Sequence, residues 1–168
     1  NIIKSKESAF ELQMDVTPGR LATTGVELYN AKGEKVKIYF DTKERKLVMD
    51  RTESGLVEFG KRSVPHDIEK NYSDVHQGVG NTPFRVFNSI NYKNDFALGT
   101  WAPLSLCKGT TYHVDIFVDK CSVEIFVDGG RIAMTNLVFP TAPYTSVKFY
   151  NNGASTSFRN ITLSELSL

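Results

Sequence analysis

Residues 111–139 read TYHVDIFVDKCSVEIFVDGGRIAMTNLVF, and apolar and polar side chains alternate along most of this stretch. Apolar residues at every second position predict strands with one buried and one outward face. A tight turn at Lys120-Cys121 would place Val118 opposite Val123 in an antiparallel pair. The stretch therefore predicts consecutive antiparallel strands and favours a β-sandwich.

A second turn is predicted at Gly129-Gly130, because glycine adopts the positive φ of a two-residue hairpin without steric cost. Both turns leave the same set of side chains facing inward. The predicted inward pairs are Val118–Val123, Ile116–Ile125, Val114–Val127, Val127–Ile132 and Ile125–Met134. The predicted outward pairs are Asp115–Phe126, Phe117–Glu124 and Asp128–Arg131.

The same alternation recurs elsewhere in the chain. It predicts strands at 10–16, 26–28, 36–40, 47–49, 147–149 and 161–166. No amphipathic helical pattern with start and stop signals is present. Many short strands separated by regular turns are typical of a sandwich, jelly roll or barrel.

Length and charge narrow the class of protein. A chain of 168 residues predicts a single domain, residues 1–168. A net charge of +1 indicates neither nucleic acid nor a membrane surface as partner. No apolar run approaches the roughly 20 residues that span a bilayer. The chain starts at Asn1 without a signal-peptide pattern, so we expect a mature product or an excised piece of a longer polypeptide.

Carboxylates on the predicted outward face are candidates for acid catalysis, since paired acids hydrolyse glycosides. They are Asp115, Asp119, Glu124 and Asp128. A general acid needs a pKa raised by burial or by a like charge, whereas carboxylates on an open sheet face stay solvated. We therefore predict ordinary surface acids there. Phe117 and Phe126 among these charges indicate a surface that something else covers.

Residues 61–103 break the alternation and predict one or two short strands within long loops. A metal cluster of His66, Asp67, Asp74 and His76 is conceivable, but the spacing matches no zinc motif. We predict no metal and no cofactor.

Large aromatic residues gather in and near the same region: Phe84, Phe87, Tyr92, Phe96 and Trp101. They could form a platform for sugar rings, or they could plug the sandwich beneath a loop, which is the commoner use of large aromatics. Trp101 and Tyr92 are the sugar-binding candidates. Cys107 and Cys121 could form a disulfide, but their spacing does not show one, and we favour free thiols.

A resemblance to a known family rests on VDKCSVEIFV (118–127), followed by Gly130-Arg131 and Phe139-Pro140. These residues resemble the C-terminal β-sandwich of glycoside hydrolase family 32, the fructan hydrolases and invertases. The segment KLVMDRTESG (46–55) is similar to a second signature of that family, in which Asp-Arg precedes Ser-Gly. Lys120 and Cys121 stand where the family more often has Arg and Ser.

The resemblance implies a two-layer antiparallel β-sandwich of the concanavalin A-like lectin/glucanase jelly-roll type. It covers residues 8–60 and 104–166 well and residues 61–103 poorly. Family members carry an N-terminal five-bladed propeller that holds the catalytic acids. The propeller motifs Asn-Asp-Pro, Arg-Asp-Pro and Glu-Cys have no counterpart in this sequence. No catalytic residue is therefore carried over to this chain.

Three hypotheses follow. The first is a non-catalytic sandwich that supports a propeller of the same polypeptide and can take part in oligomer contacts, with Phe117, Glu124 and Phe126 at or near the domain contact. The second is a lectin-like module that binds fructan polysaccharide through the 61–103 loops and Trp101. The third and weakest is a free-standing enzyme. Because polymeric fructans are extracellular, we expect a secreted, periplasmic or cell-surface protein.

Overall fold

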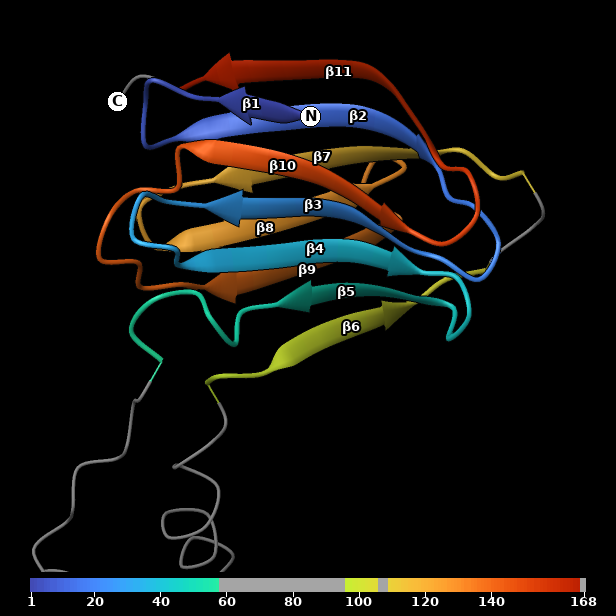
Figure 1. The fold of residues 1–168 in the computed structure, drawn as a ribbon, viewed down its shortest axis with the longest axis horizontal. Coiled ribbons are helices and arrows are strands. Elements are labelled where there is room, and N and C mark those ends of the chain that lie inside the picture. Colours follow the sequence, from blue (N-terminus) through green and yellow to red (C-terminus); the bar gives the residue numbers. More distant parts are fainter. Residues whose placement is uncertain (58–95, 106–108, 167–168) are drawn as a thin grey trace, which may run out of the picture.

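The alternating segments form β-strands in the computed structural model, which describes residues 1–57, 96–105 and 109–166 (Figure 1). Within these residues the strands are β1 (Ile2–Lys4), β2 (Phe10–Thr17), β3 (Thr23–Tyr29), β4 (Lys35–Asp41), β5 (Lys46–Asp50), β6 (Gly99–Pro103), β7 (Tyr112–Val118), β8 (Ser122–Val127), β9 (Ile132–Leu137), β10 (Ser146–Asn152) and β11 (Ser157–Glu165). The all-β prediction is confirmed. In this part of the chain no helix is long and apolar enough to cross a membrane.

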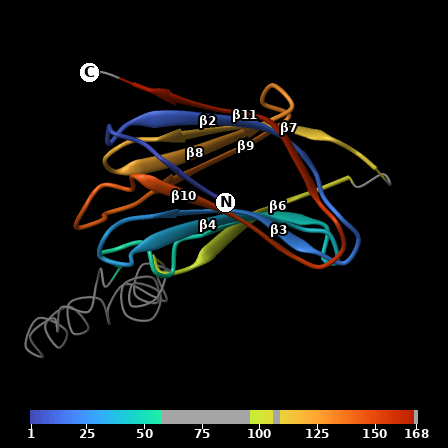
Figure 2. The ribbon, with the colours of Figure 1, turned by 45° about the horizontal axis from the view of Figure 1, so that its top comes forward.

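The strands build two antiparallel sheets that lie face to face, as Figure 2 shows. Sheet A has the order β1-β10-β3-β4-β5-β6, and sheet B has the order β11-β2-β7-β8-β9. The chain crosses from one sheet to the other between β1 and β2, between β2 and β3, between β6 and β7, between β9 and β10, and between β10 and β11. This is the predicted jelly-roll sandwich. The outer faces of the two sheets therefore lie on opposite sides of the molecule.

The core lies between the sheets and takes one side chain from every second position. Its fully buried members include Leu12, Val26, Ile38, Leu47, Val114, Ile116 and Ile125. Phe40 of sheet A stacks on Tyr112 of sheet B, with ring centroids 5.0 Å apart. Burying each large apolar side chain contributes about 1.5–3 kcal/mol, so this layer supplies most of the driving force for folding.

The predicted register of β7, β8 and β9 is confirmed. Val118 pairs with Val123, and Val127 pairs with Ile132, as the alternation required. The second turn is longer than the two residues predicted, because β8 ends at Val127 and β9 begins at Ile132. Within this turn Asp128, Gly129 and Gly130 all have positive φ. The predicted pair of Asp128 with Arg131 was wrong.

Asp128 binds β7 instead of the facing strand of its own hairpin. Its backbone N–H donates to the carbonyl of His113 over 2.8 Å. Its carboxylate accepts the N–H of His113 over 2.9 Å. These bonds close the end of the β7–β8 pair and turn the residue out of the β8–β9 ladder.

The segment that follows β5 ties the two sheets together at one end of the sandwich. The Arg51 guanidinium donates to the carbonyl of Phe96 over 2.8 Å and to the carbonyl of Leu137 over 2.9 Å. It also lies 3.9 Å from the centroid of the Phe96 ring. Burial lowers the pKa of Arg51 from its ordinary value. One side chain thus joins the approach to β6 in sheet A with the end of β9 in sheet B.

The rest of this segment packs against the β9–β10 connection. Ser54 is buried, and its carbonyl accepts a hydrogen bond from the hydroxyl of Tyr144, which is 1% exposed. Gly55 has a φ of 134°, and a Cβ there would lie 2.5 Å from the carbonyl oxygen of Phe139. Only glycine fits that backbone and that approach. The Asp-Arg…Ser-Gly signature is therefore explained by packing between the sheets.

Candidate functional site

The outer face of sheet B carries the three predicted contact residues. Phe117 and Phe126 lie diagonally on β7 and β8, partly buried, with ring centroids 5.9 Å apart and planes at 79°. Glu124 lies directly opposite Phe117 and accepts a hydrogen bond from the Thr135 hydroxyl over 3.4 Å. The two rings stabilise each other edge to face and keep part of their surface open to a partner.

Polar side chains surround this aromatic pair. Glu11 of β2 lies opposite Phe117, and Asp115 lies opposite Phe126. The four carboxylates predicted to face outward all do so: Asp119 and Asp128 are exposed, while Asp115 and Glu124 are partly buried. In the described part of the chain no group of three or more His, Cys, Asp or Glu side chains could hold a metal ion.

A histidine lies between two carboxylates on this face. His113 of β7 lies with Nδ1 2.8 Å from Asp15 Oδ1 and with Nε2 3.4 Å from Asp115 Oδ1. The Asn160 amide donates to the other Asp15 oxygen over 2.7 Å, and Gln13 donates to Asp115 over 2.9 Å. These side chains join β11, β2 and β7 across the sheet.

The contacts shift both ionisable partners toward their charged forms. The hydrogen bonds from Asn160 and then from His113 lower the pKa of Asp15. The hydrogen bond to Asp15 raises the pKa of His113, with further support from the charges of Asp115 and Asp128. Because these groups already bond to one another, the cluster is best described as a surface ion pair that holds strands together.

Sequence reasoning missed this cluster. Alternation along β7 shows that His113 points outward, but Asp15 lies 98 residues earlier in the chain. Asn160 reaches Asp15 from a bulged position with a φ of 52°, which the alternation does not predict. No local signal in the sequence brings the three together.

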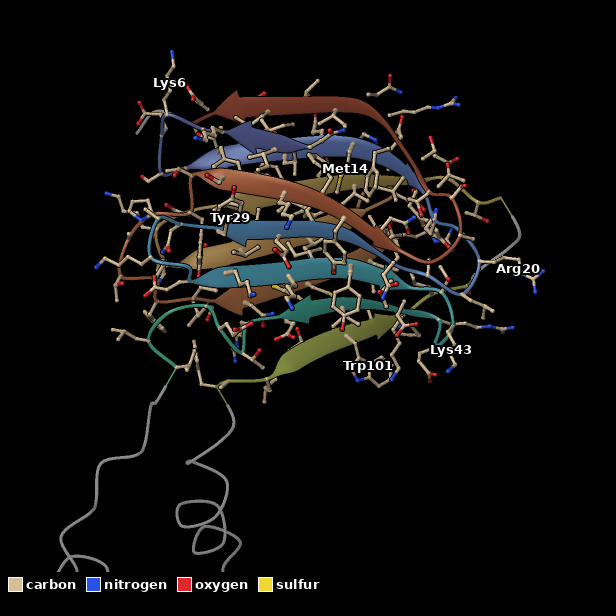
Figure 3. All side chains as sticks on the ribbon, in the orientation of Figure 1. Lys6, Met14, Arg20, Tyr29, Lys43 and Trp101 are labelled. Atoms are coloured by element: carbon tan, nitrogen blue, oxygen red, sulfur yellow. The ribbon has the colours of Figure 1, made fainter. Side chains whose placement is uncertain are left out.

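Trp101 lies on the outer face of sheet A, on the edge strand β6, and is 57% exposed (Figure 3). The interpretation that it plugs the sandwich was wrong. Phe96, by contrast, packs on Phe139 with ring centroids 5.5 Å apart. The remaining predicted aromatic and metal residues, Phe84, Phe87, Tyr92, His66, Asp67, Asp74 and His76, lie outside the described residues.

A surface cavity and an exposed cysteine are the two other features considered as candidate sites. A small surface cavity of about 220 Å³ lies at the β7–β8 turn, lined by Ser8, Asp119, Lys120 and Tyr144 among others. It is smaller than the roughly 300–1,000 Å³ of most ligand sites. Cys121 is exposed and carries a free thiol, as favoured above, and Cys107 lies outside the described residues.

Known proteins are similar to this chain over nearly the whole sandwich. Residues 1–165 match the family model of glycosyl hydrolases family 32, C terminal. The chain is similar to a levanbiose-producing levanase of Bacillus subtilis (strain 168), with 30% identity over 95 residues, covering 56% of this chain and 17% of that protein. A levanase of the same strain is 23% identical over 160 residues, covering 94% of this chain and 19% of that protein.

Among solved structures, the exo-inulinase from Aspergillus awamori has the same fold. It superposes with a TM-score of 0.66 at 17% identity, covering 99% of this chain and 26% of that chain. The chain therefore spans about a quarter or less of the length of each of these three proteins.

Proposed function

Because the chain belongs to the family of glycosyl hydrolase family 32 C-terminal domains, we propose that it is the non-catalytic β-sandwich of a fructan- or sucrose-hydrolysing glycosidase. In this proposal it packs against a catalytic propeller of the same polypeptide and supports it. The match of the family model over residues 1–165 is the observation that carries the proposal.

The lengths of the relatives support a partner domain. This chain covers only 17% and 19% of the two levanases, so most of each relative lies outside the matched region. The outer face of sheet B offers a surface for such a neighbour. Its paired rings, Phe117 and Phe126, are large anchors of the kind enriched in domain and protein contacts, with polar side chains around them as a rim.

A stability comparison in two contexts tests this placement. Phe126→Ala should lower the melting temperature of the full-length enzyme more than it lowers that of this chain alone, because only the enzyme also loses the domain contact. Lys4→Ala, at an exposed position on β1, serves as the control and should change neither. An equal loss from Phe126→Ala in both contexts would contradict the placement on sheet B.

Activity assays test whether the sandwich is non-catalytic. The full-length enzyme should hydrolyse levan, inulin or sucrose, whereas this chain alone should release no reducing sugar from any of them. Hydrolysis by the isolated chain would overturn the non-catalytic assignment and support a free-standing enzyme.

Cellular location and assembly are part of the same proposal. A substrate that is an extracellular polymer requires an enzyme that is secreted, periplasmic or held at the cell surface, and the sandwich can then add contacts between copies. Cell fractionation checks the first point, and light scattering of the full-length enzyme checks the second.

A second function, binding of fructan by the sandwich itself, is favoured by the exposure of Trp101. An indole ring that is open to solvent offers a flat apolar face on which a sugar ring can stack. Calorimetric titration of levan and inulin into this chain, with dextran as the control polymer, tests it. Heat with the fructans and none with dextran would support binding.

A further inference from the structure

Three aromatic side chains on the outer face of sheet A share one register level. Tyr150 of β10 lies opposite Gly25, Gly25 opposite Tyr39, Tyr39 opposite Val48, and Val48 opposite Trp101. The line crosses β10, β3, β4, β5 and β6, which lie side by side in sheet A (Figure 1). We call these five residues the aromatic row. Four interstrand spacings give it a length of roughly 19 Å.

Gly25 lets two rings of the row come together. It is buried between Tyr150 and Tyr39, whose ring centroids are 6.4 Å apart. A Cβ on Gly25 would lie 2.0 Å from the carbonyl oxygen of Ile38, so a larger residue would push β3 away from β4. The backbone approach and the tyrosine pair are thus built on the same position.

The tyrosine hydroxyls stay neutral and available as hydrogen-bond donors. Burial raises the pKa of Tyr150, and so does its proximity to Tyr39 and Glu27. Burial also raises the pKa of Tyr39, with Asp50 and Asp41 adding to the effect. Neutral hydroxyls beside carboxylates suit a ligand that carries many hydroxyl groups of its own.

Trp101 ends the row with an open ring. Its indole is 57% exposed even though the Lys46 ammonium lies 4.3 Å from the ring centroid. Trp101 is two strands from Tyr39, which is roughly 10 Å, with the smaller Val48 between them. The row thus presents two separate aromatic surfaces, the Tyr39–Tyr150 pair and Trp101, with the smaller side chain of Val48 between them.

Charged residues of both signs flank the row one register level away. One such residue lies on each of four neighbouring strands: Lys148 on β10, Glu27 on β3, Lys37 on β4 and Asp50 on β5. These ammonium and carboxylate groups can form hydrogen bonds with the hydroxyl groups of a ligand. The balance of charge does not favour an ionic ligand.

We propose that the outer face of sheet A binds a neutral fructan chain that runs across the strands along the aromatic row. Sugar C–H groups stack on Trp101 and on the Tyr39–Tyr150 pair, because aromatic ring faces are electron-rich and attract them. Sugar hydroxyls bond to the flanking Glu27, Asp50 and lysines. This inference rests on the fructan-binding function proposed above and gives that function a location, opposite the face proposed for the propeller.

The single tryptophan of the chain makes the test direct. Levan and inulin oligosaccharides should shift the emission of Trp101 and protect it from iodide quenching. In calorimetric titrations, Trp101→Ala and Tyr39→Ala should each weaken binding about tenfold or more. Trp101→Phe, which keeps a ring, should retain more affinity than Trp101→Ala.

Tyr29→Ala is the matched control. Tyr29 also faces outward from sheet A, but it lies four residues along β3 from Gly25, roughly 13 Å from the row. Figure 3 shows it far from Trp101 on the ribbon. Its removal should leave saccharide affinity unchanged. Circular dichroism and melting curves of every variant check that the sandwich is intact.

The outcomes separate the proposals. Affinity that survives Trp101→Ala as well as it survives Tyr29→Ala overturns the aromatic row and leaves fructan binding elsewhere on the chain. No binding of any fructan overturns both, while the support of a propeller stands. A loss of full-length enzyme stability on Trp101→Ala, with saccharide affinity unchanged, assigns this face to a protein contact and also overturns the row.

Discussion

Replacing Arg51 by alanine is expected to destabilise the sandwich by about 3 kcal/mol. The side chain makes two charge-assisted hydrogen bonds, to the carbonyls of Phe96 and Leu137, and each such bond contributes roughly 1.5 kcal/mol at the lower end of its range. Its stacking on the Phe96 ring adds about 0.5–1 kcal/mol. The side chain is partly exposed, and water replaces some of what is lost, so the sum is reduced to that figure.

Arg51→Lys should lower the free energy of unfolding by about half as much as Arg51→Ala. Lysine keeps the charge, but its ammonium is a point donor on a flexible stem, whereas the guanidinium reaches two carbonyls from one planar fork. The carbonyls of Phe96 and Leu137 belong to segments of different sheets, and a single ammonium does not bridge both.

Urea unfolding of this chain, followed by far-ultraviolet circular dichroism, measures the change in the free energy of unfolding. A loss of about 3 kcal/mol corresponds to a drop of roughly 6–12 °C in melting temperature for a domain of this size. Arg20→Ala is the control, since Arg20 is exposed and projects into solvent in Figure 3. Its effect should stay within about 0.5 kcal/mol. If Arg51→Ala matched Arg20→Ala, the argument that the signature segment ties the sheets together would be refuted.

Three further outcomes are expected. Tyr144→Phe should cost about 1–3 kcal/mol in urea unfolding, because it leaves the buried carbonyl of Ser54 without its hydroxyl donor; a change below the scatter of surface variants would contradict that bond. Gly55→Ala should cost about 3 kcal/mol or more and shift the melting temperature accordingly, since its φ of 134° and the nearby backbone exclude a Cβ; a wild-type melting curve would show that the connection relaxes freely. In an NMR titration the pKa of His113 should lie above 6.5 and fall toward that value in Asp15→Asn, and an unchanged pKa would remove the ion pair from the account. The stabilising effect of this pair is therefore complete between pH 3.8 and pH 6.5. It is lost as the pH rises through the raised pKa of His113, and it is lost on the acid side as the pH falls through the lowered pKa of Asp15.

The sequence by itself determined the all-β class and the inward faces of the strands. Alternation between 111 and 139 has a period of two, and a shift of one residue would bury Asp115 and expose Ile116. Together with short turns, that constraint leaves one register for β7, β8 and β9, and the structure has it. The family resemblance is also legible in the sequence, because its two signatures lie in continuous segments.

Only the tertiary structure decided which distant strands meet. β2 pairs with β7 and β11, and β10 pairs with β3, across long stretches of chain where no local rule selects the partner. The aromatic row and the Asp15–His113 pair both depend on those pairings. Contacts between residues far apart follow from the packing of whole sheets, which the neighbours of a residue in the sequence do not encode.

The direction of Trp101 shows the same limit at a single residue. Hydrophobicity alone would turn the indole inward, yet Thr100 and Ala102 are the residues of β6 that face the core. The reason lies in sheet B, where Asn136 of β9 comes close enough to donate to the Thr100 hydroxyl over 2.9 Å. Small side chains fit where the edges of the two sheets approach, so the large ring is left on the outside.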